Sequence, residues 1–304
     1  MFGVINVCKP KGLTSHDVVG VIRKILSIKQ VGHTGTLDPF AEGVLPVCVG
    51  KATRLIDYFD DDKEYLATIQ LGASTDTYDL EGIITNKSSK KVKREDIEKA
   101  LLNFKGEISQ LPPMYSAIKV NGKKLYEYAR AGETVNIEPR TVTIYNIELK
   151  TFDEMTQIAE ILVSCSKGTY IRSIANDLGV NLGCFGHLIK LVRTRAGKFS
   201  LESAINLPIK IDESSDSEHS KKYSLDSDAK EKIIQAIHPP LSGLSLPVIT
   251  VNDTDFERIS HGNSIKAESE KIKSGDFLIL VYNNNVIAIG QYDGVEIKVK
   301  KVLI

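Results

Sequence analysis

Two segments that lie far apart in the chain alternate between inward and outward side chains, and this pattern restricts the fold more than any other feature. In residues 64–71 the side chains of Tyr65, Ala67, Ile69 and Leu71 fall on one face, and residues 158–165 repeat the pattern. Successive side chains of a β-strand point to opposite faces, so each segment predicts a strand with one buried face. Strands of this kind are typical of antiparallel sheets that pack on one side only.

Helical periodicity occurs between these strands without regular strand–helix–strand spacing. One apolar stripe begins after Ser15, which is a suitable N-cap, and a second spans residues 94–104. A third helix is expected from near Thr169 to Gly179, where glycine favours a C-terminal end. The mixture predicts an α+β fold with a mixed, mainly antiparallel sheet flanked by helices.

The length of 304 residues indicates two domains. From about residue 245 the pattern changes to short β-like runs, at 277–282, 286–291 and 295–299, which predict a small β-barrel. Residues 212–230 are acidic and rich in serine, and we expect a polar insertion or linker there. The chain is therefore divided into a domain over residues 1–240 and a smaller one over 245–304.

The formal net charge is zero, which argues against a globally basic nucleic-acid-binding protein. Residues 161–200 nevertheless carry six basic residues against one acidic residue. This window is expected either to meet phosphates or to form a solvated helix face.

The location is predicted from the cysteines and from the apolar runs. Four cysteines stand at no metal-ligand spacing, which indicates free thiols in a reducing compartment. No apolar run has the length of a membrane span, and no secretory signal is visible at the start. We therefore expect a cytoplasmic protein with no membrane contact.

Residues 32–39, Gly-His-Thr-Gly-Thr-Leu-Asp-Pro, are too interrupted by glycine and proline for a helix or an inner strand. A carboxylate held in such a polar loop, Asp38, can act as a nucleophile or a base. The loop can also be a plain structural turn, because aspartate before proline favours one. A metal site built from His16, His33 and Asp38 is a third reading, although the spacing matches no zinc signature.

Two further positions have a structural and a functional interpretation. Tyr65 lies on the apolar face of its strand, where it is either a core residue or a platform on which a nucleobase stacks. Arg172 falls in the first turn of a predicted helix, where the helix dipole disfavours a cation. It is either a surface arginine or the partner of a carboxylate such as Asp38, which it can bind in a bidentate manner.

Four segments together, at residues 6–15, 32–46, 111–119 and 166–172, resemble the TruB family of bacterial tRNA pseudouridine synthases. The resemblance runs in order over roughly residues 3–210. It implies a pseudouridine synthase-type catalytic domain. The C-terminal segment is similar to the small RNA-binding β-barrel called PUA, which many members carry.

The resemblance implies that the chain isomerises the uridine at position 55, in the T arm of tRNA, to pseudouridine. It assigns Asp38 as the catalytic aspartate, Tyr65 as the ring that stacks on the target base, and Arg172 as the partner of the aspartate. His33 matches a histidine that contacts RNA near the flipped base. The other residues that it assigns to the uridine site are Tyr170, Leu191 and Lys9. Glu42 departs from the family pattern, where a small or hydroxyl residue is expected.

The implied reaction is an isomerisation without net redox change, so no cofactor and no metal are expected. Whether Asp38 attacks the ribose or the base stays open. We expect a monomer without an obligate protein partner. A tRNA-folding chaperone on the same scaffold is the alternative function, and dependence on a guide RNA is a further one.

Overall fold

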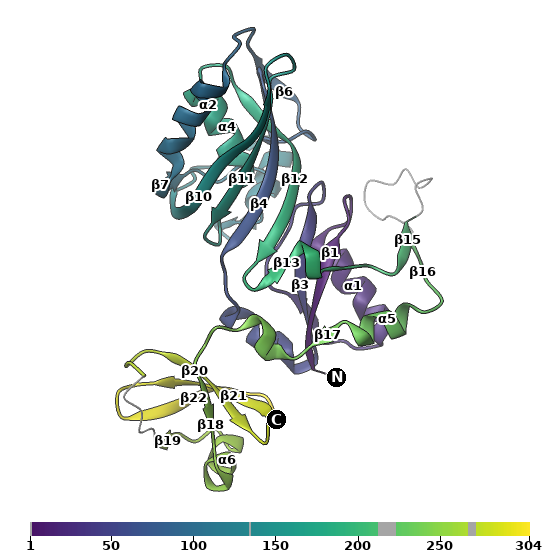
Figure 1. Ribbon diagram of the computed structural model, residues 1–304, viewed down its shortest axis with the longest axis vertical. Coiled ribbons are helices and arrows are strands. Elements are labelled where there is room, and N and C mark those ends of the chain that lie inside the picture. Colours follow the sequence, from purple (N-terminus) through teal and green to yellow (C-terminus); the bar gives the residue numbers. More distant parts are fainter. Residues whose placement is uncertain (1, 134, 212–222, 267–271) are drawn as a thin grey trace.

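The computed structural model describes residues 2–133, 135–211, 223–266 and 272–304. Within these residues the largest element is a mixed sheet of eleven strands (Figure 1). Its main path, in spatial order, is β14 (Ile205–Asn206), β1 (Gly3–Lys9), β3 (Glu42–Val49), β12 (Gly186–Ala196), β4 (Lys63–Leu71), β11 (Ile158–Cys165), β10 (Arg140–Asp153) and β7 (Gly106–Gln110). Most neighbours are antiparallel, and the parallel pairs are β1–β14 and β12–β3. The predicted fold class is confirmed.

The two alternating segments form β4 and β11, which are hydrogen-bonded neighbours in this sheet. Both strands bury every second residue on the same face, as the alternation predicts. Ala67 lies opposite Ile161, and Tyr65 lies opposite Val163. This buried face is the centre of the largest apolar cluster of the molecule, which also receives the buried sides of two helices.

Those helices are α2 (Arg94–Leu101), followed by the 3-10 turn η2 (Leu102–Phe104), and α4 (Ile171–Asn181). Figure 1 shows both on the same side of the sheet, near β10, β11 and β12. The helix at residues 94–104 was predicted with these limits, except that its last turn is 3-10. α4 begins two residues after the expected Thr169 and passes Gly179, because Gly179 packs against the backbone of Phe185 and Gly186 inside the helix instead of ending it.

The opposite end of the sheet carries α1 (Ser15–Leu26) and α5 (Ala229–Gln235), which pack together beside β1 and β3. Thr14 is the N-cap of α1 and forms a reciprocal capping box with Asp17. The expected N-cap, Ser15, is wrong by one position. No helix in the described part of the chain combines the length and the apolar character that a membrane crossing requires.

The remaining elements are short. They are β2 (Val31–His33), η1 (Gly50–Tyr58), β5 (Ala73–Thr75), β6 (Ile84–Lys87), β8 (Lys119–Val120), β9 (Lys123–Lys124), α3 (Leu125–Arg130), β13 (Phe199–Ser200), η3 (Leu201–Ser203), β15 (Ile209–Ile211), β16 (Tyr223–Leu225), β17 (Ile237–His238) and η4 (Pro240–Gly243).

The expected polar insertion or linker at residues 212–230 lies only partly within the described residues. Residues 212–222 lie outside the described residues. β16 pairs with β15, and Ala229 at the start of α5 is buried against α1. Residues 223–230 are therefore part of the packed structure.

The C-terminal part forms a separate five-stranded sheet that curls as a half-barrel, with one helix, α6 (Asp253–Ser260), beside it (Figure 1). Its strands, in spatial order, are β18 (Val248–Thr250), β20 (Phe277–Tyr282), β21 (Asn285–Tyr292), β22 (Glu296–Val302) and β19 (Ile265–Lys266). The three strands expected from the sequence are β20, β21 and β22. The sheet has its own apolar interior and is consistent with the PUA-like domain that was expected.

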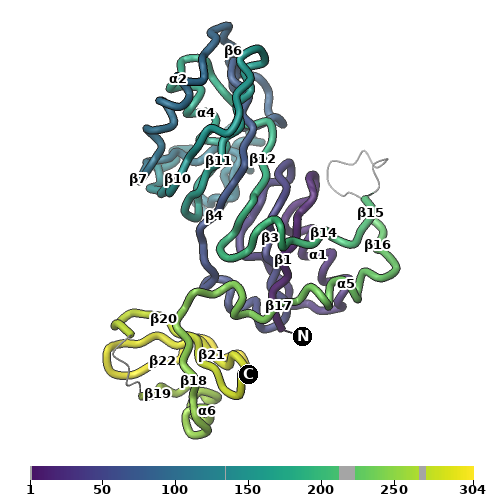
Figure 2. Tube along the Cα trace, viewed as in Figure 1, coloured from purple at the N-terminus to yellow at the C-terminus, as the bar shows by residue number. Residues whose placement is uncertain are grey.

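A third apolar cluster lies between the large sheet and the C-terminal sheet, which sit next to each other in Figure 2. It combines side chains of β3 and η1 with side chains of β20 and β21. The rings of Tyr58 and Phe277 meet edge to face with 5.2 Å between their centroids. Ser245 donates a hydrogen bond to Asp60 at 2.6 Å, so the segment after η1 also contacts the chain that enters the C-terminal sheet.

Candidate active site

The loop at residues 32–39 is fixed by buried groups on both sides. Arg193, on β12, is almost fully buried and donates from its guanidinium to the carbonyl oxygens of Gly35 and Thr36, at 3.1 and 3.2 Å. On the other side the Ser15 hydroxyl accepts from the Leu37 N–H at 2.8 Å and donates to its carbonyl. The loop therefore presents Asp38 from a rigid backbone.

Asp38 lies beside Arg172 of α4. Arg172 Nε is 3.0 Å from Asp38 Oδ2. The contact is an ion pair through one guanidinium nitrogen and one carboxylate oxygen. The Nε–H group is not oriented to form a hydrogen bond. The expected bidentate pairing is wrong, since the other two guanidinium nitrogens are used elsewhere: Nη2 donates to the Tyr115 carbonyl at 3.1 Å, and Nη1 donates to Asp79.

Asp79 is a site residue that the sequence analysis missed. Its Oδ2 accepts from Arg172 Nη1 at 3.2 Å, and its Oδ1 accepts from the Thr77 hydroxyl and the Glu81 N–H. The side chain is buried, so Arg172 bridges two carboxylates. In the sequence Asp79 looks like any other turn aspartate, and only the tertiary structure brings it to Arg172.

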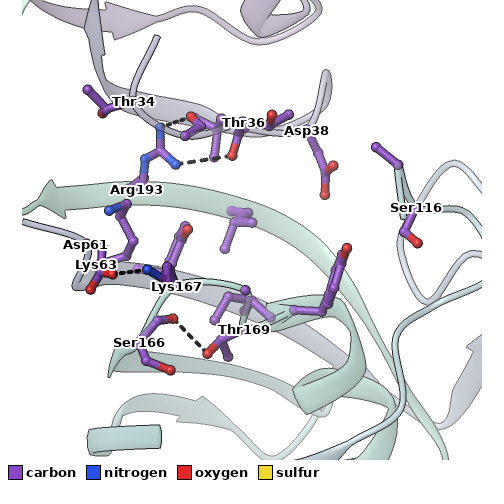
Figure 3. A pocket seen from close by; sticks show the side chains of 18 of the residues that line it. Thr34, Thr36, Asp38, Asp61, Lys63, Ser116, Ser166, Lys167, Thr169 and Arg193 are labelled. Carbon is purple, nitrogen blue, oxygen red and sulfur yellow. Dashed lines mark hydrogen bonds and ion pairs between the residues drawn. The ribbon is translucent and has the colours of Figure 1, made fainter. Parts of the chain in front are cut away.

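A pocket of about 510 Å³ opens beside Asp38. Of the residues that the sequence assigned to a site, it is lined by Asp38, Tyr65, Tyr170, Arg172 and Leu191. Figure 3 shows Asp38 and Ser116 on one side of this pocket and Arg193, Lys63 and Lys167 on the other. The residues come from the 32–39 loop, from β4 and β12, and from the start of α4.

The walls of the pocket are aromatic and apolar. Tyr65 projects from β4 and Leu191 from the neighbouring β12, on the buried face of the sheet. Tyr170 directly precedes α4, and Gln110 holds it by accepting from its N–H at 2.7 Å and donating to its carbonyl at 3.0 Å. Burial raises the pKa of Tyr65, so its phenol is neutral at pH 7.

Two expected site residues do not line the pocket. Lys9 is fully buried, and its ammonium donates to the carbonyl oxygens of Pro10, Leu13 and Pro39. It ties β1 to the end of the 32–39 loop. His33 precedes the pocket-lining part of this loop, and burial together with nearby Arg193 lowers its pKa, so the imidazole is neutral at pH 7.

Burial raises the pKa of the Asp38 carboxyl. The Arg172 guanidinium opposes the rise, and the Asp79 carboxylate adds to it. The Asp38 side chain is 34 % exposed, and it lines the pocket. A carboxylate with a raised pKa is a stronger base and nucleophile when it is ionised.

The described residues contain no group of three histidine, cysteine, aspartate or glutamate side chains arranged to hold a metal ion. The hypothesis of a metal site built from His16, His33 and Asp38 is therefore not supported. What the site offers is a clamped carboxylate at the edge of a pocket with aromatic walls. This arrangement suits attack on a flat ring, or on the carbon that carries it, once the ring lies against Tyr65.

Comparisons with known proteins identify the family. Residues 23–171 match the family model described as the N-terminal domain of the TruB family pseudouridylate synthases. The tRNA pseudouridine synthase B of Clostridium kluyveri is 41 % identical over 308 residues, which span 100 % of both chains. That of Clostridium novyi is 50 % identical over 208 residues, covering 68 % of this chain and 71 % of the relative.

The fold comparison agrees and includes the C-terminal sheet. A chain in the crystal structure of a Cbf5-Nop10-Gar1 complex superposes with a TM-score of 0.74 at 28 % identity, covering 100 % of this chain and 85 % of that one. With a full-length relative at 41 % identity and a matching family model, the chain belongs to the TruB family of pseudouridylate synthases.

Proposed function

We propose that the chain converts the uridine at position 55, in the T arm of tRNA, into pseudouridine, with Asp38 as the nucleophile. The observation that carries the proposal is the ion pair of Asp38 and Arg172 at the edge of a pocket walled by Tyr65. Relatives of the same length and family are named tRNA pseudouridine synthase B, which supports tRNA as the substrate.

The target base must leave its stack before a side chain can reach its glycosidic bond, and unstacking costs a few kcal/mol. Stacking on Tyr65 offsets part of this cost, since base–aromatic stacking contributes about 1–3 kcal/mol. We assign Tyr170 and Leu191 to the walls of the uridine pocket. His33, as a neutral imidazole outside the pocket, is suited to fill the space that the flipped base leaves.

Lys9 acts in this proposal through the backbone. One of its three hydrogen bonds holds the carbonyl of Pro39, which directly follows Asp38, and the other two hold Pro10 and Leu13. It is therefore a positioning residue and not a contact of the uridine.

The reaction moves the bond from N1 to C5 of the same uracil, so no external group or electron carrier takes part. Asp38 attacks either the anomeric carbon of the ribose or C6 of the base. Arg172 favours the ionised carboxylate and fixes its direction in both routes.

The six cations of the basic window at residues 161–200 do not all face solvent. Arg172 and Arg193 are buried. The other four have partners inside the chain: Lys167 with Asp61, Lys190 with Glu42, Arg195 with Asp62, and Lys198 with the Leu244 carbonyl.

A second candidate for the RNA grip is the segment at residues 119–130, which follows the pocket residues Ser116 and Ala117. It combines cations with tyrosine rings, and Lys123 Nζ lies 4.4 Å from the centroid of Tyr128. Cations and aromatic rings on one surface suit a sugar–phosphate backbone with splayed bases.

The direct test is release of tritium from C5 of uridine in an unmodified tRNA transcript that is labelled at that carbon. We expect the purified protein alone to release one tritium per tRNA, since C5 exchanges its hydrogen for the ribose bond. A transcript in which uridine 55 is replaced by cytidine is the control and should release none from that position. No release from folded wild-type substrate would refute the proposal, and release that needs an added RNA would favour a guided enzyme.

The raised pKa of Asp38 predicts the acid limb of the pH profile. The ionised carboxylate is the reactive form, so kcat/KM falls as the pH drops through the pKa of the free enzyme. Because this pKa is raised, the fall begins at a higher pH than an ordinary aspartate, with a pKa of about 4, would give. A profile of kcat/KM that stays flat down to pH 4 would contradict a nucleophile with a raised pKa.

The chaperone alternative makes no use of the Asp38–Arg172–Asp79 arrangement, so the enzyme is favoured.

The four cysteines are all free thiols, and a tRNA substrate is found in the cytoplasm, where we place the protein. Nothing in the proposal requires a second copy of the chain.

A further inference from the structure

Lys63, the first residue of β4, is a pocket residue to which the proposed mechanism gives no task. It is 7 % exposed and lines the pocket with Asp38 and Tyr65. Its ammonium has three N–H donors, and its one hydrogen bond to another described residue is a long one of 3.4 Å to the Asp62 carbonyl. An ammonium this deeply buried is seldom left with so few partners.

The carboxylates near Lys63 are already engaged by other cations. Asp61 pairs with Lys167 at 2.7 Å, and Asp62 pairs with Arg195. Within the described residues no carboxylate lies at ion-pair distance from Lys63.

The other ionisable groups around Lys63 do not neutralise it either. On β12, Arg193 is a second cation, and its guanidinium donates only to carbonyl oxygens. On β11, burial raises the pKa of the Cys165 thiol to about 11, so the thiol is uncharged at neutral pH. On β4 itself, Tyr65 is a neutral phenol. Lys63 and Arg193 thus place two cations on this side of the pocket, and within the described residues neither is paired with a carboxylate.

The register of β4 places Lys63 within reach of a base that stacks on Tyr65. Residues 63 and 65 point to the same face, and their Cα atoms are separated by about 7 Å along a strand. The Lys63 side chain also lies beside the 32–39 loop: a methyl group added at Gly35 would lie 3.6 Å from Lys63 Cε. A ring on Tyr65 would thus have one edge toward Asp38 and another toward the ammonium.

Both routes of attack by Asp38 put negative charge on the uracil. In attack on the ribose, a bond forms from the carboxylate oxygen to C1′ while the C1′–N1 bond breaks, and its electron pair goes to N1 and spreads to the carbonyl oxygens. In attack on C6, the electron pair of the C5–C6 double bond moves onto O4. A preorganised cation near these oxygens stabilises the developing charge.

We propose that the Lys63 ammonium donates a hydrogen bond to the uracil carbonyl oxygen that gains this charge. The proposal rests on the proposed function and adds no proton transfer or covalent step to it. Lys63 is then a second catalytic residue beside Asp38, because it contacts the base that is detached or attacked.

The test is single-turnover pseudouridine formation on saturating unmodified tRNA by Lys63→Met and Lys63→Gln. We expect the rate to fall by about 10²–10³-fold, as when one donor to a developing oxyanion is removed. The Kd for tRNA should change by less than about threefold, because the uncharged base makes little use of the cation. Lys150→Met, on β10 with an exposed ion pair to Glu148, is the matched control and should keep the wild-type rate.

A rate within about threefold of wild type would overturn the proposal. So would a loss that appears only as a higher Kd, which would make Lys63 a grip for an RNA phosphate. If wild type itself forms no pseudouridine, the proposed function fails first, so the two failures are distinguishable.

The wild-type pH profile tests the same idea without a substitution. Burial lowers the pKa of Lys63 to about 8. The protonated form is the active one, so the single-turnover rate should decline as the pH rises through this value. Lys63→Arg, which stays charged, should move the decline to higher pH. A wild-type rate that stays level to pH 9 would count against Lys63 as the charged donor.

Discussion

Asp38→Asn gives a protein that binds tRNA with wild-type affinity and forms no detectable pseudouridine. The amide has nearly the shape of the carboxylate but cannot act as a nucleophile. We expect a loss of at least about 10⁴-fold in the single-turnover rate, the scale seen when a catalytic nucleophile is removed. The measurement is tritium release in parallel with filter binding of the same labelled transcript.

The same variant separates the two functions. If wild type and Asp38→Asn refold a misfolded tRNA equally well, a chaperone activity resides in the binding surface alone. Residual turnover above about 1 % of wild type would mean that Asp38 is not the nucleophile. The binding measurement guards against misreading a folding defect as a catalytic one.

Arg172→Met costs both activity and stability. Arg172 is buried and bridges Asp38 and Asp79, so its loss leaves the Asp79 carboxylate inside the protein without a cation. Removing one partner of a buried ion pair typically costs about 3–5 kcal/mol. We expect a drop of this size in the free energy of unfolding by urea, together with loss of tritium release. Arg94→Met, at an exposed i,i+4 pair on α2, is the control and should change stability by less than about 1 kcal/mol.

A double variant shows where the loss arises. Adding Asp79→Asn to Arg172→Met removes the unpaired charge, so it should recover part of the lost stability and none of the lost activity. Unchanged stability in Arg172→Met, or recovery of activity in the double variant, would contradict the bridging arrangement.

The parts of the fold that the sequence predicted are those encoded by local periodicity. The alternation at residues 64–71 and 158–165 gives β4 and β11, and the apolar stripe after Ser15 gives α1, whose N-cap is one residue earlier. The parts that could not be predicted depend on residues far apart. Arg172 and Asp79 are 93 positions apart, and Asp79 has no local feature that sets it apart from other turn aspartates.

Composition does not report which charged side chains are buried by contacts with distant parts of the chain. The excess of cations at residues 161–200 left open a phosphate-binding surface or a solvated helix face, yet Arg193 is buried and supports the 32–39 loop. Its burial depends on the parallel pairing of β12 with β3, at Arg193 and Gly43, and no short-range pattern reports such a pairing. In the same way, Lys9 was expected near the uridine, but its ammonium donates hydrogen bonds to backbone carbonyl oxygens.

The stretch from η1 to the start of β4 both lines the pocket and contacts the C-terminal part of the chain. Ile56, Asp57, Phe59, Asp60 and Asp61 line the pocket. In the same stretch, Tyr58 contacts Phe277 of the C-terminal sheet, and Asp60 accepts a hydrogen bond from Ser245 in the segment that leads into that sheet. A recombinant chain that exchanged this sheet for a foreign RNA-binding module would have to supply matching contacts for Tyr58 and Asp60, or the catalytic wall would lose its support. Replacement of the C-terminal sheet would therefore also alter the support of the pocket wall.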